Sequence, residues 1–279
     1  MEKGISKQHS FYDGMKFYAK QLLFNRRRLM YSKKLVARLA RKVSTKEIPK
    51  VEIIFSIPLR TYIYVHNTRS YFYSGFYERN VVMYLKNIVR KLKPCLFIDI
   101  GAYVGYYAIL MAKWGCSVVA LEPDPRSFAL LMNNLFMSGL PEKVIALNEA
   151  VCDRENSQIP FKFSKSPSES SSTGYLRGDL VEFMGHVPCT KLDAIAQFLE
   201  LRDKNMIIKI DVEGAALSVL RGSDSTIKRF KPYIVLEVHR TFDENDEMLA
   251  ISMLRKYGYK WRLLEWRSQR NFIVALEPL

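Results

Sequence analysis

Acidic side chains stand at the ends of four apolar segments of this 279-residue chain. In chain order they are Asp99 in LFIDIG, Glu122 in SVVALEP, Asp211 and Glu213 in IIKIDVEG, and Glu237 with His239 in YIVLEVH. Carboxylates accept hydrogen bonds from cationic ligands, and both carboxylates and imidazole exchange protons with a substrate. The pattern therefore predicts an acidic pocket for a positively charged ligand.

A turn with two glycines follows Asp99. Gly101 lets the backbone turn sharply and approach a ligand, and Gly105 lets a helix begin near the strand, where its free N–H groups bind an anion. Glu122 comes about twenty residues later, where a carboxylate binds both ribose hydroxyls. The spacing D-x-G-x-x-x-G differs from the G-x-G-x-x-G of dinucleotide sites. S-adenosylmethionine is a cation without phosphates, and it therefore fits an acidic pocket better than a dinucleotide does.

Alternating strands and helices position these residues. The predicted strands of the main sheet are 96–100, 117–122, 144–151, 206–211, 233–239, 260–265 and 272–277, with a further hairpin strand over 158–163. Helices are predicted over 80–92, 104–114, 125–138 and 192–200, from Gly214 onward, and over 246–257. Continuous apolar strands that alternate with helices predict a doubly wound, mostly parallel α/β sheet. Ligands of such sheets bind at the carboxyl ends of the strands.

Three regions are expected along the chain. Residues 1–50 form a basic helical arm, in which 15–43 read as an amphipathic helix. Residues 51–94 are a lead-in of strands and one helix, and residues 95–279 form the ligand-binding catalytic domain.

The basic charge is concentrated near the amino terminus. The formal net charge is +15, yet residues 1–94 hold 21 Lys/Arg against 5 Asp/Glu, and residues 95–279 hold 22 against 23. From Gly14 to Lys46 there are eleven basic residues and no acidic one. Peripheral contact with an anionic membrane through 15–43, contact with RNA, and packing on this or a second subunit all remain open. The charge bears on where the protein works and says little about its reaction.

The cysteines favour a reducing compartment. Cys95, Cys116, Cys152 and Cys189 form no C-x-x-C pair, and three of them lie in apolar runs, so we expect buried, reduced thiols. The first residues contain no apolar signal segment, and no transmembrane helix is expected. We therefore expect a cytoplasmic protein. A peripheral location at a membrane surface is compatible with this expectation.

Longer stretches resemble the FkbM family of S-adenosylmethionine-dependent methyltransferases. They are FIDIGAYVGYYAIL, VVALEPDPRSFALLMNN, LNEAV, KLDAI, IIKIDVEGAALSVLRG and KPYIVLEVH, in family order between about Glu78 and His239. The resemblance implies the class I (Rossmann-like) methyltransferase fold, with seven strands of which the last is antiparallel. It also implies O-methylation of a hydroxyl on a sugar, a glycan, or a lipid-linked or natural-product acceptor.

The resemblance also assigns residues to the cofactor. Those implied to bind S-adenosylmethionine are Glu78, Asp99, Gly101, Ala102, Tyr103, Gly105, Glu122, Pro123, Asp124, Glu149, Ala150 and Asp211. Asn134 matches a family asparagine. Two positions depart from the family pattern: Tyr103 stands where asparagine is frequent, and Ala216 stands where an acidic residue is frequent.

Methyl transfer to a hydroxyl requires a base within hydrogen-bond reach. The candidates are Asp211, Glu213, Glu237 and His239, with Asp211 expected nearest the methyl group and His239 a possible base. In a less favoured alternative, Asp211, Glu213 and Glu237 hold a divalent cation. Two other functions stay open: an RNA methyltransferase that uses the basic arm, and a non-catalytic protein that binds an anionic surface.

Overall fold

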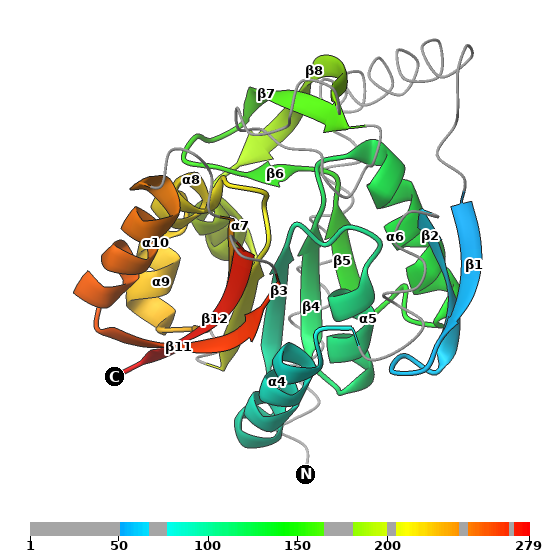
Figure 1. Ribbon diagram of the computed structural model, residues 1–279, viewed down its shortest axis with the longest axis horizontal. Coiled ribbons are helices and arrows are strands. Elements are labelled where there is room, and N and C mark those ends of the chain that lie inside the picture. Colours follow the sequence, from blue (N-terminus) through cyan, green and yellow to red (C-terminus); the bar gives the residue numbers. More distant parts are fainter. Residues whose placement is uncertain (1–50, 67–76, 165–180, 200–204, 240–244, 268–270) are drawn as a thin grey trace.

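The computed structural model describes residues 51–66, 77–164, 181–199, 205–239, 245–267 and 271–279 (Figure 1). The predicted basic arm lies outside the described residues. No helix in the described part of the chain has both the length and the apolar character needed to cross a membrane.

The largest sheet has seven strands in the order β11-β12-β10-β9-β3-β4-β5. Their bounds are β3 (Leu96–Ile100), β4 (Ser117–Leu121), β5 (Val144–Leu147), β9 (Met206–Ile210), β10 (Tyr233–His239), β11 (Tyr259–Trp266) and β12 (Asn271–Pro278). Strands β5, β4, β3, β9 and β10 pair in parallel, and β12 runs antiparallel to both β10 and β11. The predicted doubly wound, mostly parallel seven-stranded sheet is confirmed.

Helices cover both faces of this sheet (Figure 1). One face packs against α4 (Arg79–Leu92), α5 (Tyr106–Lys113) and α6 (Pro125–Met137). The other packs against α7 (Leu192–Phe198), α8 (Ala216–Arg221), α9 (Asp224–Phe230) and α10 (Asn245–Lys256). Because both faces are buried, strands such as LFIDI and MIIKI are apolar almost throughout and show no clean alternation.

Two predicted elements divide in the structure. The expected strand 144–151 ends at Leu147, and β6 (Ala150–Val151) leaves the sheet to pair with β8 (Val181–Thr190). Asn148 causes the break, because its side chain donates to the backbone oxygens of Glu122 and Pro123 and turns the chain. Strand β8, which was not predicted, also pairs with β7 (Ser157–Ser164), the expected hairpin strand.

The helix expected from Gly214 is also divided, into α8 and α9. Gly222 lies between them, and a Cβ there would stand 1.9 Å from the backbone oxygen of Cys152. The backbone at Gly222 therefore lies too close to the backbone of Cys152 for a residue with a side chain to continue one straight helix through this position.

Two strands precede the main sheet, as predicted, and they pair as a hairpin. Strands β1 (Val51–Ser56) and β2 (Thr61–His66) pair antiparallel and lie beside α6 (Figure 1). Asn134 on α6 holds this hairpin: its side chain accepts from the Tyr64 N–H at 2.6 Å and donates to the oxygens of Tyr64 and Val104. The family asparagine is thus structural here. The region boundaries at residues 50 and 94 stay predictions.

The cysteines correct an expectation. All four are buried, as predicted, but they are paired: Cys95 with Cys116 and Cys152 with Cys189, with Cα–Cα distances of 4.7 and 6.0 Å. The prediction of free, reduced thiols is wrong in this structure. Spacing along the chain could not reveal the pairs, because Cys95 and Cys116 meet only when β3 and β4 lie side by side.

Candidate active site

Alternate residues of three neighbouring strands place the candidate catalytic groups on one face. Successive side chains of a strand point to opposite faces. On the face that packs against α4 and α5, each strand carries an apolar residue and then polar ones toward its carboxyl end. The polar groups are Asp99 on β3, Lys209 and Asp211 on and after β9, and Glu237 with His239 on β10.

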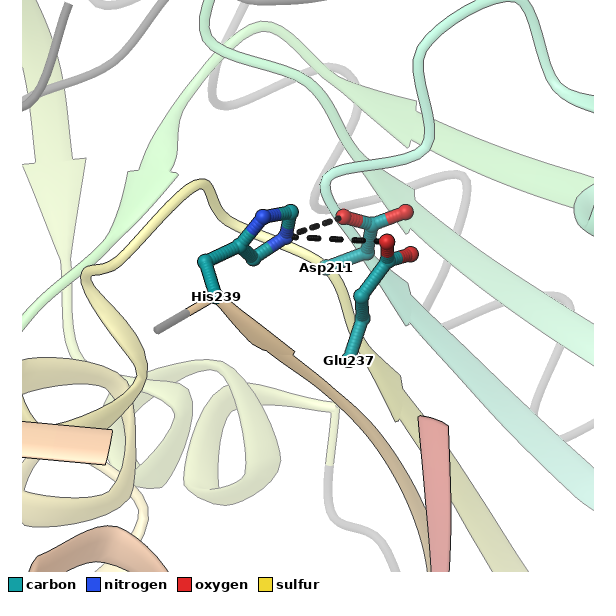
Figure 2. Close-up of side chains that lie close together, drawn as sticks. All are labelled: Asp211, Glu237 and His239. Carbon is teal, nitrogen blue, oxygen red and sulfur yellow. Dashed lines mark ion pairs between the residues drawn. The ribbon is translucent and has the colours of Figure 1, made fainter. Parts of the chain in front are cut away.

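Asp211 contacts two members of this group, and Figure 2 shows it beside His239 and Glu237. One carboxylate oxygen is 2.9 Å from Nζ of Lys209, and the other is 3.5 Å from Nε2 of His239. The Asp211 N–H donates to the backbone oxygen of Ile100 at 3.0 Å, which fixes the start of the loop after β9 against β3. Lys209 is 3% exposed, so this ion pair is screened little by water.

Two more carboxylates surround His239. Nδ1 of His239 lies 3.4 Å from Glu213, and Nε2 lies 3.8 Å from Glu237, which reaches it from the same strand (Figure 2). The Asn271 side-chain amide lies 3.3 Å from Nδ1. The structure therefore brings together all four predicted catalytic residues.

These contacts shift the pKa values in opposite directions. Burial alone would lower the pKa of His239, but the carboxylates of Glu213, Asp211 and Glu237 raise it to about 10. Burial alone would raise the pKa of Asp211, but Lys209 and His239 hold it well below its usual range. Burial and the neighbouring Asp211 raise the pKa of Glu237 well above its usual range. In the ligand-free protein His239 is thus a cation at neutral pH.

This charge state predicts a contrast between two buried histidines. Burial lowers the pKa of His66 to about 4, so at pH 7.5 His66 is neutral while His239 is protonated. Because the pKa of His239 is raised above its unfolded value of about 6.5, the stability it adds is complete below that pH and is lost as the pH rises toward 10. Nitrogen-15 NMR of histidine-labelled protein measures both states. A neutral His239 at pH 7.5 would contradict the prediction, and Glu213→Gln should lower its pKa.

Glu78 approaches the same cluster from the start of α4. Its buried carboxylate accepts a hydrogen bond from the Tyr107 hydroxyl and lies 3.5 Å from the Arg267 guanidinium. Arg267 in turn lies 3.7 Å from Glu237. Glu78 therefore faces the β10 end of the site.

The glycine turn links β3 to α5. The N–H groups of Gly101 and Ala102 both donate to the backbone oxygen of Leu121, which holds the turn against the end of β4. A Cβ on Gly101 would stand 1.8 Å from the backbone oxygen of Asp211, so only glycine fits there. Gly105, with φ 86°, is the N-cap of α5. The turn thus packs directly on the loop that carries Asp211.

Glu122 lies at the next strand end. Its two carboxylate oxygens accept the N–H groups of Tyr103 and Asp124, each at 2.8 Å. The Tyr103 hydroxyl is 2.8 Å from Nδ1 of His66. Glu122 is 6% exposed, so its carboxylate is shielded from bulk water. Burial raises the pKa of Glu122 to about 8.

The rest of this region is structural. Asp124 caps α6 by accepting the Arg126 N–H, and its carboxylate pairs with the Arg126 guanidinium at 2.7 Å. Arg126 also reaches Glu182 on β8, so Asp124 ties the small sheet to the main one. Pro123 precedes Asp124, and its oxygen accepts from Asn148.

Glu149 and Ala150 lie just past the end of β5. Glu149 is 5% exposed, and Ala150 begins β6. Asn148 holds this segment against the Glu122 backbone, so it adjoins the β4 end and lies away from Asp211. The predicted residues therefore form two groups: a carboxylate cluster around Asp211 and a rim along the ends of β3, β4 and β5.

Three of the predicted site residues adopt left-handed backbone conformations. Glu78, Tyr103 and Glu213 have φ values of 46°, 50° and 49°. Such a conformation costs a non-glycine residue about 1–2 kcal/mol and is found most often at functional sites. For Glu213 it turns the carboxylate toward His239. Neither Asp211 nor Glu213 caps α8, whose N-cap is Ala215 with no side-chain cap bond.

The polar groups fit S-adenosylmethionine. Oδ2 of Asp99 is buried and has no hydrogen-bond partner among the residues that the structure describes. Burial raises the pKa of Asp99 to about 7, and a cationic ligand group beside it would restore the ionised form. An unsatisfied buried carboxylate at the glycine turn thus suits a ligand with an ammonium group.

A divalent cation fits less well. Asp211, Glu237 and His239 offer ligand atoms within 4.8 Å of one another, in place of the predicted set with Glu213. However, the Lys209 ammonium already pairs with the Asp211 carboxylate at 2.9 Å.

Four polar side chains that contact the predicted site residues were not predicted from the sequence: two cations, one hydroxyl and one neutral imidazole. They are Lys209, Arg267, Tyr107 and His66. Lys209 did carry a signal, since a lysine inside an otherwise apolar strand needs a buried partner. Arg267 carried none, because it comes from the last hairpin, far from every other site residue in the chain.

Known proteins with similar sequences and structures carry the same activity in their names. The model of the FkbM methyltransferase domain matches residues 99–261. Hexuronic acid methyltransferase AglP from Haloferax volcanii is 26% identical over 177 residues, covering 63% of this chain and 68% of that protein. The crystal structure of methyltransferase FkbM from Methylobacillus flagellatus is similar over 64% of this chain and 42% of its own, with 16% identity and a TM-score of 0.46. A methyltransferase from Agrobacterium tumefaciens is 11% identical, over 85% of this chain and 72% of its own, with a TM-score of 0.49.

The domain model covers more than half of the chain and includes the glycine turn, Glu122, Asp211 and His239. This chain belongs to the FkbM family of methyltransferases.

Proposed function

We propose that this protein transfers a methyl group from S-adenosylmethionine to a hydroxyl of a sugar in a glycan. The observation that carries the proposal is the cluster of Asp211, Glu237 and His239 at the strand ends, directly beside the glycine turn. The name of the Haloferax relative, a hexuronic acid methyltransferase, supports a sugar acceptor.

The rim residues would hold the cofactor. Glu122 suits the ribose hydroxyls, Asp99 and Glu78 suit the ammonium of the methionine part, and Glu149 with Ala150 suits the adenine. When bound, S-adenosylmethionine supplies an electrophilic methyl group on a sulfonium cation. Burial raises the pKa values of the Asp99 and Glu122 carboxyl groups. A cation bound nearby stabilises the ionised form of such a group.

The cluster orients the acceptor and takes its proton. Asp211, ionised beside Lys209, orients the His239 imidazole toward the acceptor hydroxyl, whose single proton hydrogen-bonds to that imidazole. The pKa of His239 falls when a second cation enters this pocket, because like charges oppose each other. The neutral imidazole then accepts the hydroxyl proton, and Glu213 stabilises the imidazolium that forms.

Calorimetry with S-adenosylmethionine tests the cofactor site. We expect the wild type to bind, and Glu122→Ala to bind about 100-fold more weakly, because it loses charge-assisted hydrogen bonds worth about 1.5–3 kcal/mol each. Glu142→Ala, an exposed glutamate after α6, is the matched control and should bind normally. No binding by the wild type would rule out the proposed function.

The nature of the methylated atom is tested chemically. Protein incubated with radiolabelled S-adenosylmethionine and uronic-acid-containing oligosaccharides should label them. Mild alkali cleaves a methyl ester and leaves a methyl ether intact. The proposal requires alkali-stable label, and alkali-labile label would assign the reaction to a carboxylate.

A further inference from the structure

A second cavity lies outside the strand-end site. It has a volume of about 640 Å³ and is bounded by one face of α4, one face of α5 and the turn between β1 and β2. Four cationic side chains line it: Arg60, Arg79, Lys86 and Lys113. Among the residues that the structure describes, no acidic side chain lines it. The charge of the lining therefore favours an anion.

The remaining lining is hydrocarbon and aromatic. Val82 and Met83 face it from α4, and Leu110 and Trp114 face it from α5. Apart from the tyrosine hydroxyls, the described part of the lining contains no amide, hydroxyl or carboxylate side chain. Sugar hydroxyls need such groups as partners when they leave water. The lining thus suits a phosphate attached to a hydrocarbon better than a phosphate attached to a sugar.

Arg60 stands at the turn in a conformation that disfavours it. Its φ is 51°, in the left-handed region where glycine or asparagine fits better and arginine costs about 1–2 kcal/mol. Strain of this kind is a pointer to function when the side chain has a use. Here the side chain supplies a cation to the cavity.

Lys113 links the turn to α5. Its Nζ donates to the backbone oxygen of Leu59 at 2.6 Å, so the ammonium is held at the cavity wall. Partial burial lowers the pKa of Lys113, and an anion in the cavity would favour its charged form.

The cavity adjoins the candidate active site through Tyr77. Tyr77 lines the cavity, and its hydroxyl accepts a hydrogen bond from Arg267 at 2.9 Å. Arg267 contacts both Glu78 and Glu237. The ring of Tyr106, also in the lining, packs edge-on against Tyr77 at 5.7 Å. Tyr77 and Arg267 therefore form a shared wall between the cavity and the carboxylate cluster.

The mouth of the cavity is apolar. Ile57 and Met83 both line it, and they are 56% and 53% exposed. On the adjoining hairpin, Phe55 and Tyr62 are also about half exposed and pack ring against ring. A hydrocarbon chain that leaves the cavity would thus pass over apolar surface. The chain's own basic arm is not a suitable occupant, because its eleven cations between Gly14 and Lys46 would face four more.

We propose that this cavity binds the phosphate and the adjoining hydrocarbon of a lipid-linked glycan acceptor. The proposal rests on the proposed glycan methylation and names the class of its substrate. The phosphate pairs with Arg60, Arg79, Lys86 and Lys113, the hydrocarbon lies over Ile57 and Met83, and the sugar extends past Tyr77.

Calorimetry on the full chain tests this with four probes: farnesyl phosphate, farnesol, inorganic phosphate and glucose 1-phosphate, each below its aggregation limit. We expect farnesyl phosphate to bind at least about tenfold more tightly than the other three, since only it uses both parts of the lining. Equal binding of all anions would overturn the proposal, and so would equal binding of farnesol.

The variant Arg60→Gly separates binding from folding. It removes one cation and relieves the left-handed strain, so we expect about tenfold weaker binding of farnesyl phosphate with an unchanged or higher Tm. Arg60→Lys should retain most of the affinity, and Arg255→Ala, an exposed arginine on α10, should behave as wild type. Wild-type affinity in Arg60→Gly would overturn the proposal.

S-adenosylmethionine affinity in Arg60→Gly keeps the two proposals apart. It should equal that of the wild type, because Arg60 lies outside the cofactor rim. Loss of lipid phosphate binding alone refutes only the lipid-linked acceptor, whereas loss of S-adenosylmethionine binding by the wild type refutes the methyl transfer itself.

Discussion

Asp211→Asn is expected to lower kcat/KM for methyl transfer by about 1000-fold. The carboxylate lies between the Lys209 ammonium and the His239 imidazole, and both keep it ionised. An amide at this position cannot hold the His239 imidazole through a charged acceptor or stabilise a proton on it. Losses of about 10²–10³ are usual when one preorganised polar group is removed from an active site. Steady-state kinetics with a methylatable glycan measure the effect.

The same substitution also affects folding, and a second variant separates the two effects. Asp211→Asn leaves the buried Lys209 without its ion partner, which costs about 3–5 kcal/mol. The double variant Asp211→Asn/Lys209→Met removes both charges, so we expect its Tm to recover while its activity stays low. Asp153→Asn, an exposed aspartate, is the matched control. Full activity in the double variant would remove Asp211 from the mechanism.

Gly101→Ala is expected to destabilise the fold by about 4 kcal/mol or more. The added methyl group would stand 1.8 Å from the backbone oxygen of Asp211, and neither backbone segment can move without breaking its hydrogen bonds to the sheet. The φ of 83° at Gly101 adds strain of about 1–2 kcal/mol for any residue with a Cβ. Denaturant unfolding of the full chain measures the loss.

Gly258→Ala is the control for this prediction. Its φ of 82° equals that of Gly101 within a degree, but a Cβ there meets nothing within 4 Å. Only the conformational cost of about 1–2 kcal/mol should appear. If the two variants lose the same stability, the close approach of the glycine turn to the Asp211 loop is not what requires glycine at position 101.

The order and type of the main elements could be predicted from sequence because local rules determine them. Strands β3, β4, β9 and β10 are continuous apolar runs with few residues that favour helix, and the helices between them follow turn signals such as the Asp124 cap with Pro125 at the first helical position. The prediction failed where contacts between residues distant in the sequence determine the structure. An example is Asn148, whose hydrogen bond to the Glu122 backbone turns the chain after β5.

The candidate site divides in the same way. That acidic residues end the strands and that a glycine turn follows Asp99 can be read from the sequence, because neighbours along a strand fix these relations. The charges of these groups depend on the fold. Lys209 on β9, Arg267 from the last hairpin and Tyr107 on α5 reach the carboxylates from separate elements. The pKa of a buried carboxylate or imidazole depends on such neighbours and on the depth of burial, and neither is encoded by spacing along the chain.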